Sequence, residues 1–220
     1  MKVAIIGASG KTGMHLVREA LDRGWSVVGV CRPASAGKLA EFSGRDGFTL
    51  MTAPVVSDVA TLRKALVGCD AVLAVLFSVR DLKATDLVAS LAAATADHGV
   101  RRLVFTAGEV TAVREAGEEF TGRQRFLLAL AKPISWLTPY SVTDMLDASV
   151  KIAEQTDWAW TIIRAPTLRE TPAVGYRVCG LSEVTSAHAL SRRDYAACML
   201  DSLGNPDHER RTLTVVPRTT

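Results

Sequence analysis

One glycine-rich stretch near the amino terminus constrains the fold of this chain more than any other feature. Residues 7–13 read Gly-Ala-Ser-Gly-Lys-Thr-Gly, between an apolar run at 2–6 and an amphipathic segment at 14–23. The apolar run is rich in β-branched residues and has the length of a strand. The later segment has apolar residues three and four apart, the spacing of one helix face. Residues 25–31 indicate a second strand, so the sequence predicts a β-loop-α-β unit.

Glycines have a physical purpose in this loop, because a dinucleotide diphosphate needs close contact with the main chain. Without Cβ atoms the loop can point N–H groups at phosphate oxygens, and the following helix adds its partial positive charge. Ser9 and Thr12 add hydroxyl donors, and Lys11 adds a cation. The spacing is not that of a Walker A loop. An ordinary strand-to-helix turn is the alternative, but the flanking strand and helix favour dinucleotide binding.

The composition is that of an ordinary globular protein. The 220 residues are 48% hydrophobic and 22% charged, with a net charge of +3, which is enough chain for one substantial core. Basic residues form no long tract, so we expect no nucleic-acid partner. No apolar run has the length of a membrane span and no signal peptide is evident, so we expect no membrane partner. The four cysteines have neither CxxC nor metal spacing, which predicts a cytoplasmic location and no metal site.

Predicted strands and helices alternate along the rest of the chain. We expect further strands at 48–51, 71–77, 102–106, 158–164, 176–179 and 211–216. We expect helices at 34–43, 61–66, 85–98, 124–131, 141–155 and 191–200, and a loop at 109–122 that covers the site. This pattern predicts an α/β fold, a Rossmann-like doubly wound parallel sheet. We expect a single domain over 1–220, with 1–108 as the cofactor-binding half and 109–220 as the substrate side.

The residues after three strands are candidate cofactor contacts, because ligands bind at the carboxyl edge of such sheets. Arg32 ends the second strand where an acidic residue favours NAD and an arginine favours the 2′-phosphate of NADP, with Lys38 nearby to help. Asp58 can accept from the adenine amino group with Val59 against the ring, or it can cap a helix. A third group flanks the cofactor and the meeting point of nicotinamide and substrate: Leu76, Phe77, Thr106 and Ala107.

The ordered motifs resemble the atypical short-chain dehydrogenases/reductases, in the NAD(P)H-binding group that includes biliverdin-IXβ (flavin) reductase and NmrA-like proteins. They are GASGKTG at 7–13, GCDAV at 68–72, GVRRLV at 99–104, WTIIRAP at 160–166 and SRRDYA at 191–196, with VRDL at 79–82 similar to the reductase branch. The resemblance spans nearly the whole chain. Phe77 departs from the glycine usual at its position.

The resemblance implies a set of cofactor contacts by position. It assigns the diphosphate to Gly7, Ser9, Gly10, Lys11, Thr12 and Gly13. It assigns the 2′-phosphate to Arg32, adenine to Asp58 and Val59, and the ribose to Leu76 and Phe77. It assigns the nicotinamide side to Thr106 and Ala107, with Pro166 as a boundary of that pocket.

The usual catalytic pair of the superfamily, Tyr-x-x-x-Lys, is missing. Tyr140 is followed four residues later by Asp144, and a carboxylate there disfavours the phenolate. Thr106, Tyr140 and Lys151 remain as weak catalytic candidates. The structural alternative for Tyr140 is a pocket wall or core residue, and for Lys151 a solvated helix face. We therefore expect hydride transfer governed by placement, with the chemistry carried by the cofactor.

Two functions remain open, together with a weaker third. Trp136 and Tyr140 flank Pro139 and could wall a flat site, which favours an NADP-dependent oxidoreductase with an aromatic acceptor such as a flavin, quinone or tetrapyrrole. The missing Tyr-x-x-x-Lys pattern favours instead a non-catalytic, NmrA-like NADP-binding sensor. A relative of nucleotide-sugar or isoflavone-type reductases is the third. For the partners we expect a small-molecule acceptor, and for the oligomeric state a monomer or homodimer.

Overall fold

The computed structural model describes residues 1–79, 82–108, 122, 125–126, 129, 141–184 and 188–218. Almost all of the loop predicted at 109–122 and most of the helix predicted at 124–131 lie outside these residues. So do Arg80 and Asp81 of the reductase-like motif, and Trp136 and Tyr140 of the predicted acceptor wall. The statements that follow concern the described part of the chain.

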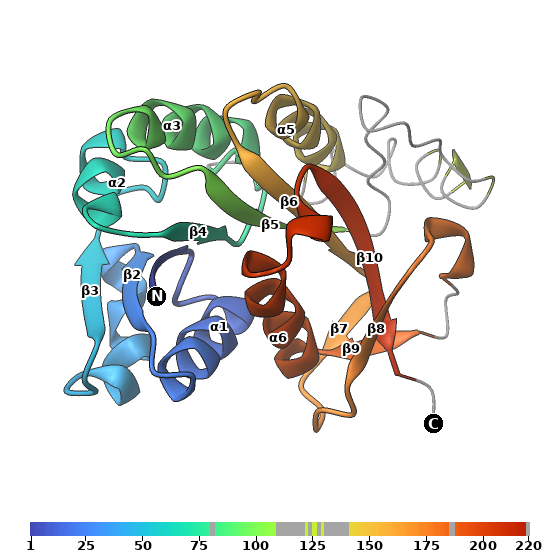
Figure 1. Cartoon of the computed structure of the whole chain (residues 1–220), viewed down its shortest axis with the longest axis horizontal. Helices are drawn as coiled ribbons and strands as arrows, with labels where there is room; N and C mark the ends of the chain where they lie inside the picture. Colours follow the sequence, from blue (N-terminus) through green and yellow to red (C-terminus); the bar gives the residue numbers. More distant parts are fainter. Residues whose placement is uncertain are drawn as a thin grey trace.

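A mainly parallel sheet forms the centre of the molecule (Figure 1), and its strands run in the order β3-β2-β1-β4-β5-β6-β10-β8. The bounds are Lys2–Ile6 for β1, Ser26–Cys31 for β2, Phe48–Thr52 for β3, Ala71–Ala74 for β4, Arg102–Gly108 for β5, Ala159–Ala165 for β6, Tyr176–Cys179 for β8 and Arg211–Pro217 for β10. Each neighbouring pair is parallel except β10 with β8. The strand order reverses between β1 and β4, which confirms the predicted doubly wound class.

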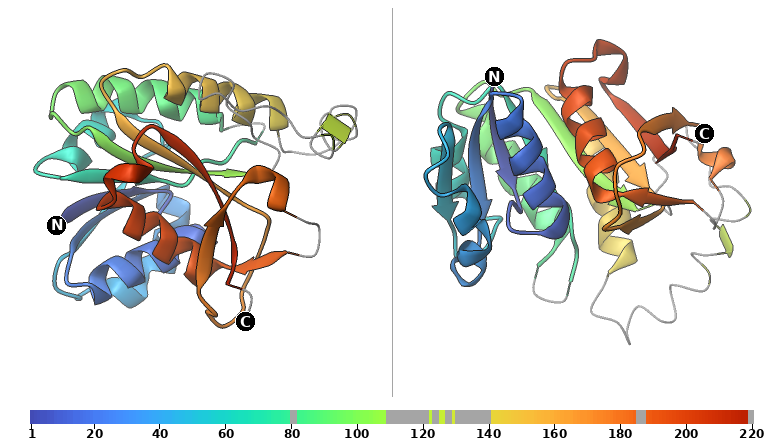
Figure 2. Two further views of the ribbon diagram at one scale, coloured as in Figure 1. Left: turned by 45° about the vertical axis from the view of Figure 1, so that its right-hand side comes forward. Right: turned by 90° about the horizontal axis from the view of Figure 1, so that it is seen from below.

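Helices cover both faces of this sheet. The helices α2 (Val59–Leu66), α3 (Ala84–Ala96) and α5 (Val142–Ala153) pack on one face. On the other face α1 (Lys11–Asp22) and α6 (Arg192–Leu203) lie side by side. Short 3₁₀ turns are η1 (Pro33–Phe42), η3 (Leu181–Glu183) and η4 (Pro206–His208). Figure 2 shows the sheet between the two helix layers from two further directions.

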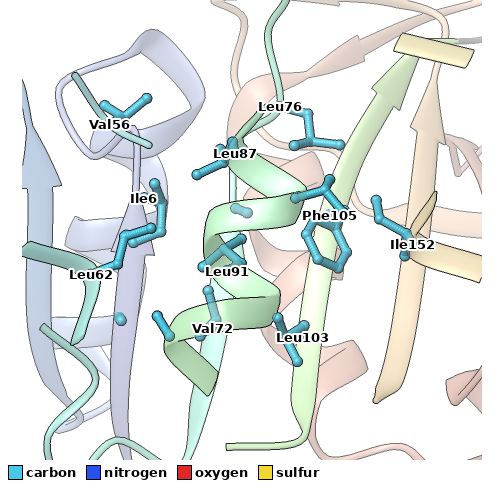
Figure 3. Close-up of a cluster of buried hydrophobic side chains, with 14 of the residues drawn as sticks. Ile6, Val56, Leu62, Val72, Leu76, Leu87, Leu91, Leu103, Phe105 and Ile152 are labelled. Carbon is cyan, nitrogen blue, oxygen red and sulfur yellow. The ribbon is translucent and has the colours of Figure 1, made fainter. Parts of the chain in front are cut away.

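The two faces have separate cores because successive strand side chains point to opposite sides. On one side, Leu87 and Leu91 of α3 cover Val72 and Phe105 (Figure 3). On the other side, Leu73 and Val104, the neighbours of these strand residues, pack with α1 and α6. The tryptophans of the predicted strand at 158–164 are buried core residues, as predicted, with exposed fractions of 4% and 3%.

The structure differs from the prediction in two places. The apolar run at 71–77 predicts one long strand, yet β4 ends at Ala74 and residues 75–77 lie outside any strand. A small second sheet, in which β7 (Thr167–Arg169) pairs in parallel with β9 (Ala189–Ser191), was not predicted. Strands of three residues are too short to show a periodic pattern. Within the described residues we find no helix with the length and apolar character of a membrane span.

Candidate functional site

A cavity of about 740 Å³ opens at the carboxyl edge of the parallel strands. Its walls come from both halves of the chain, because residues of α1 and β5 line it together with residues of α5 and α6. It lies where the strand order reverses, which is the usual place for a ligand in such sheets.

The glycine loop shapes one end of this cavity. Gly7 has φ +83°, a backbone conformation that only glycine adopts without strain. The loop then closes on itself through a 3.0 Å bond from the Gly10 N–H to the Gly7 carbonyl. A Cβ atom at Gly13 would lie 2.2 Å from the Gly7 oxygen and 2.7 Å from the Ala8 oxygen. Gly13 therefore lets α1 approach β1, and it does not itself line the cavity.

The polar groups around this loop suit an anion. Gly10 is the N-cap of α1, and no side chain caps the helix or places an acidic group in its first turn. Ser9, Lys11 and Thr12 line the cavity beside it. The Ser9 hydroxyl also lies 2.8 Å from that of Ser35 in η1. The N-terminus of α1 and the hydroxyls of Ser9 and Thr12 therefore lie along one end of the cavity, an arrangement that suits a diphosphate.

Charge on the described lining is of one sign only. The charged side chains are Lys11, Arg32, Lys38 and Arg192, all cations, with no carboxylate among them. Arg32 and Lys38 are exposed and lie after β2, where the sequence places the 2′-phosphate contact. The cavity is therefore suited to ligands with more than one negative charge.

The proposed adenine contacts lie beside the cavity and do not line it. Asp58 is the N-cap of α2 and accepts a 2.8 Å bond from the Thr61 N–H, which confirms the capping interpretation. The hydrogen bonds from Thr61 hold the pKa of Asp58 below its ordinary value. Val59 also lies outside the lining, and Val56 is the residue of this segment that lines the cavity. Contact of Asp58 or Val59 with adenine stays a prediction.

The segment after β4 forms the middle of the cavity. The Thr106 hydroxyl accepts a 2.8 Å bond from the Leu76 N–H and lies 3.4 Å from the Leu76 carbonyl, to which it donates. The Ser141 N–H donates to the Ser78 carbonyl at 3.3 Å. Between these fixed neighbours Phe77 has 47% of its surface exposed. Leu76, Phe77, Thr106 and Ala107 all line the cavity, with the Thr106 hydroxyl engaged in a structural bond.

The other candidates are placed less favourably for catalysis. Lys151 is exposed on α5 and does not line the cavity, and neither does the buried Pro166. Asp144 accepts from the Ala84 N–H at 2.7 Å and from the Thr85 hydroxyl at 2.6 Å. Burial raises the pKa of Asp144, but these hydrogen bonds outweigh it and leave the pKa below its ordinary value. Asp144 is therefore an ionised structural residue, unsuited to donating a proton.

Several lining residues were not predicted, because they come from distant segments: Ser35, Val56, Leu82, Ser141, Val142, Met145, Leu168, Arg192 and Tyr195. Tyr195 donates a 2.6 Å bond to the Ile163 carbonyl, and burial raises its pKa, so it acts as a wall. The signal that could have found Arg192 is its place directly after a Ser N-cap near a strand end. In the described residues no group of three or more His, Cys, Asp or Glu side chains could hold a metal ion.

Comparison with known proteins agrees with this geometry. A family model described as NAD(P)H-binding matches residues 7–206. The chain belongs to this NAD(P)H-binding family. The match begins at Gly7, the first glycine of the loop at 7–13 (the glycine cradle), and ends beyond α6, so it includes both walls of the cavity. The predicted resemblance to the NAD(P)H-binding group is confirmed.

Relatives of this NAD(P)H-binding protein include reductases. It is 38% identical over 112 residues to cinnamoyl-CoA reductase 1 of Oryza sativa subsp. japonica, a match of 47% of this chain and 33% of that protein. The match thus spans about a third of the relative's length.

Solved structures share the fold at low sequence identity. ChuY, an anaerobillin reductase from Escherichia coli O157:H7, has a TM-score of 0.73 at 15% identity, covering 100% of this chain and 98% of ChuY. A short-chain dehydrogenase/reductase of Veillonella parvula DSM 2008 in complex with NADP has a TM-score of 0.71 at 17% identity, covering 97% and 93%.

Proposed function

We propose that this protein is an NADP(H)-dependent oxidoreductase that transfers a hydride between nicotinamide and a small, flat acceptor of the flavin, quinone or tetrapyrrole type. The observation that carries the proposal is a single cavity of about 740 Å³ that includes both the glycine cradle and an apolar region beyond Thr106. A site for the nucleotide alone would not need that second region. The reductases among the relatives support the same reaction class.

The residues present fit a dinucleotide phosphate. The N–H groups at the N-terminus of α1 and the hydroxyls of Ser9 and Thr12 would hold the diphosphate, with Lys11 as a nearby cation. Arg32 and Lys38 would hold a 2′-phosphate, since an arginine fork matches phosphate geometry. When bound, the nicotinamide supplies the hydride chemistry.

The residues of the chain position the two reactants and line the acceptor region with apolar side chains. Leu82, Met145 and Leu168 give the far region an apolar surface, and the exposed Phe77 adds an aromatic side chain to the lining. Such a surface suits a flat conjugated acceptor, because stacked rings bury apolar area on both faces. No described lining side chain is a carboxylic acid or a histidine, so we propose that the proton comes from solvent. Holding two reactants in the correct relative position can by itself account for much of the decrease in the activation free energy.

The test is stopped-flow oxidation of NADPH with FMN, a quinone and a tetrapyrrole as acceptors. We expect turnover with at least one of them. Lys11→Gln should raise the KM for NADPH by roughly ten-fold, the loss of one charged contact. Lys64→Gln, an exposed lysine on α2 outside the cavity, is the matched control and should leave it unchanged. The proposal fails if NADPH binds and no acceptor is reduced.

That failure would favour the second candidate, an NmrA-like sensor that binds NADP without catalysis. The missing Tyr-x-x-x-Lys pattern supports the sensor, because no conventional proton donor replaces it among the described lining residues. The apolar lining beyond Thr106, at Leu82, Met145 and Leu168, supports the enzyme, since an acceptor needs space next to the nicotinamide. Nucleotide binding without turnover of any acceptor separates the two.

A further inference from the structure

One cation of the cavity has no role in the nucleotide site as proposed above. Under the proposed function, Lys11 serves the diphosphate and Arg32 with Lys38 the 2′-phosphate. The fourth cation is Arg192, the first residue of α6. It comes from the half of the chain that forms the substrate side, and no carboxylate lines the described cavity to neutralise it from within.

The sheet order places Arg192 far from the 2′-phosphate contact. Arg32 follows β2, whereas Arg192 follows β9, whose Leu190 pairs with Leu168 just beyond the end of β6. The strands β2 and β6 are four places apart in the sheet. With neighbouring strands ~4.8 Å apart, the carboxyl ends of β2 and β6 are separated by roughly 19 Å. Figure 1 shows β7, β9 and α6 together on the side away from β2 and β3.

The Arg192 side chain is held from outside the cavity. Its Nε lies 2.8 Å from Oε1 of Glu170, and the other oxygen of Glu170 lies 2.9 Å from Nε2 of His15 on α1. Glu170 is 53% exposed and does not line the cavity, whereas Arg192 is 18% exposed and does. The pairing with Glu170 therefore restricts the rotamers of Arg192 from the solvent side. A guanidinium has five N–H donors, so contact at Nε leaves it able to bind a second anion.

The surroundings of Arg192 favour the binding of an anionic ligand group over a neutral one. Leu168 and Tyr195 line the cavity near it, and the Tyr195 hydroxyl is already bonded to the Ile163 carbonyl. A charged contact beside apolar walls is stronger than one in open water. Glu170 pairs with the guanidinium from outside the cavity, whereas a neutral acceptor would offer the N–H groups on the cavity side no anionic partner.

We infer that Arg192 binds an anionic group of the acceptor, so that the substrate class is a flat conjugated ring system that carries a carboxylate or phosphate. This inference rests on the proposed function. It makes Arg192 a specificity-determining residue, which discriminates between acceptors that have the same ring system and different charge.

The test uses two flavins with one ring system, FMN with its phosphate and riboflavin without it. Their dissociation constants are measured by flavin fluorescence with the protein saturated in NADP⁺, so that no reaction occurs. We expect FMN to bind roughly ten-fold more tightly than riboflavin, the effect of one charged hydrogen-bonded contact. Arg192→Met should remove this preference by weakening FMN alone, and Arg192→Lys should retain part of it. Arg193→Met is the matched control, because Arg193 is the exposed neighbour outside the cavity.

A second acceptor pair, menadione and its anionic sulfonate, repeats the comparison in turnover. The inference is overturned if Arg192→Met leaves the preference for the anionic member intact. It is also overturned if that variant weakens NADP⁺ binding instead, which would assign Arg192 to the cofactor diphosphate. Turnover of the anionic and the neutral acceptors at equal rates would overturn this inference but would still support the proposed function. If none of the four acceptors (FMN, riboflavin, menadione and its sulfonate) is reduced, the proposed function itself is wrong.

Discussion

Gly13 is the residue at which the cradle tolerates least change. Its Cα faces main-chain oxygens of Gly7 and Ala8, and a Cβ at 2.2 Å from the first would force backbone atoms to move. We expect Gly13→Ala to lower the free energy of unfolding by roughly 1–3 kcal/mol, the usual cost of overpacking, as measured by urea denaturation. Gly37→Ala is the control, since nothing lies within 4 Å of a Cβ at Gly37. Equal urea midpoints for Gly13→Ala and Gly37→Ala would contradict this explanation of why residue 13 is a glycine.

Arg32 should decide which nicotinamide nucleotide binds. It lines the cavity after β2 and is exposed, so a substitution there disturbs little else. Arg32→Glu replaces attraction to the 2′-phosphate by repulsion, and we expect the Kd for NADP⁺ to rise by about 100-fold while that for NAD⁺ changes little. Isothermal titration with both nucleotides measures this. Arg101→Glu, at the amino end of β5 and outside the lining, is the control. Equal losses for both nucleotides would refute the assignment.

At the scale of the element, α5 is joined to α3 through one carboxylate. The N-cap of α3 is Lys83, which makes no side-chain cap, and Asp144 of α5 accepts from Ala84 and Thr85 in its place. We expect Asp144→Ala to lower the free energy of unfolding by roughly 1–3 kcal/mol, the cost of charged hydrogen bonds lost. Asp147→Ala, an exposed aspartate on the same helix, should have little effect. Urea denaturation of both variants at neutral pH makes the comparison.

The same carboxylate predicts a pH dependence. Hydrogen bonds hold the pKa of Asp144 in the folded state below the ordinary value of 3.8, so the folded state favours the ionised form. Its contribution to stability is therefore full above about pH 5 and is lost as the pH falls through the folded pKa. The stability difference between the wild type and Asp144→Asn should shrink below pH 4. If the stability difference between the wild type and Asp144→Asn instead grows as the pH falls, Asp144 does not stabilise the fold in its ionised form.

Local sequence predicted the regular elements well and the contacts between them poorly. The cradle, α1 and β2 follow from glycine spacing and periodicity, which depend on neighbours in the chain. The early end of β4 could not be predicted, because the residues after Ala74 are held by the hydroxyl of Thr106 and by Ser141. The role of Asp144 as a cap for another helix likewise depends on tertiary structure. Arg192 was missed as a lining residue for the same reason, since its position after a Ser N-cap is a local signal and its place in the cavity depends on the fold.

For the whole molecule, ligand binding and folding should be strongly linked. The cavity is lined by residues from Gly7 to Tyr195, so only the fully folded chain forms it, and we expect one unfolding transition. At 100 times its Kd, NADP⁺ should add about 2.7 kcal/mol of stability. For a chain of this length that corresponds to an increase in Tm of roughly 5–10 °C. Differential scanning fluorimetry measures the shift. Two transitions, of which NADP⁺ moves only one, would show that the cavity does not span a single cooperative unit.

The loop that receives the diphosphate is already closed by its own main chain. Gly7 and Ala8 donate to the Val30 carbonyl at 3.0 and 3.1 Å, and Gly10 donates to Gly7 at 3.0 Å. A surface fixed in this way loses little conformational entropy when a partner arrives. Nucleotide capture should therefore be a one-step encounter, with an observed rate that rises linearly with concentration and no slow isomerisation behind it.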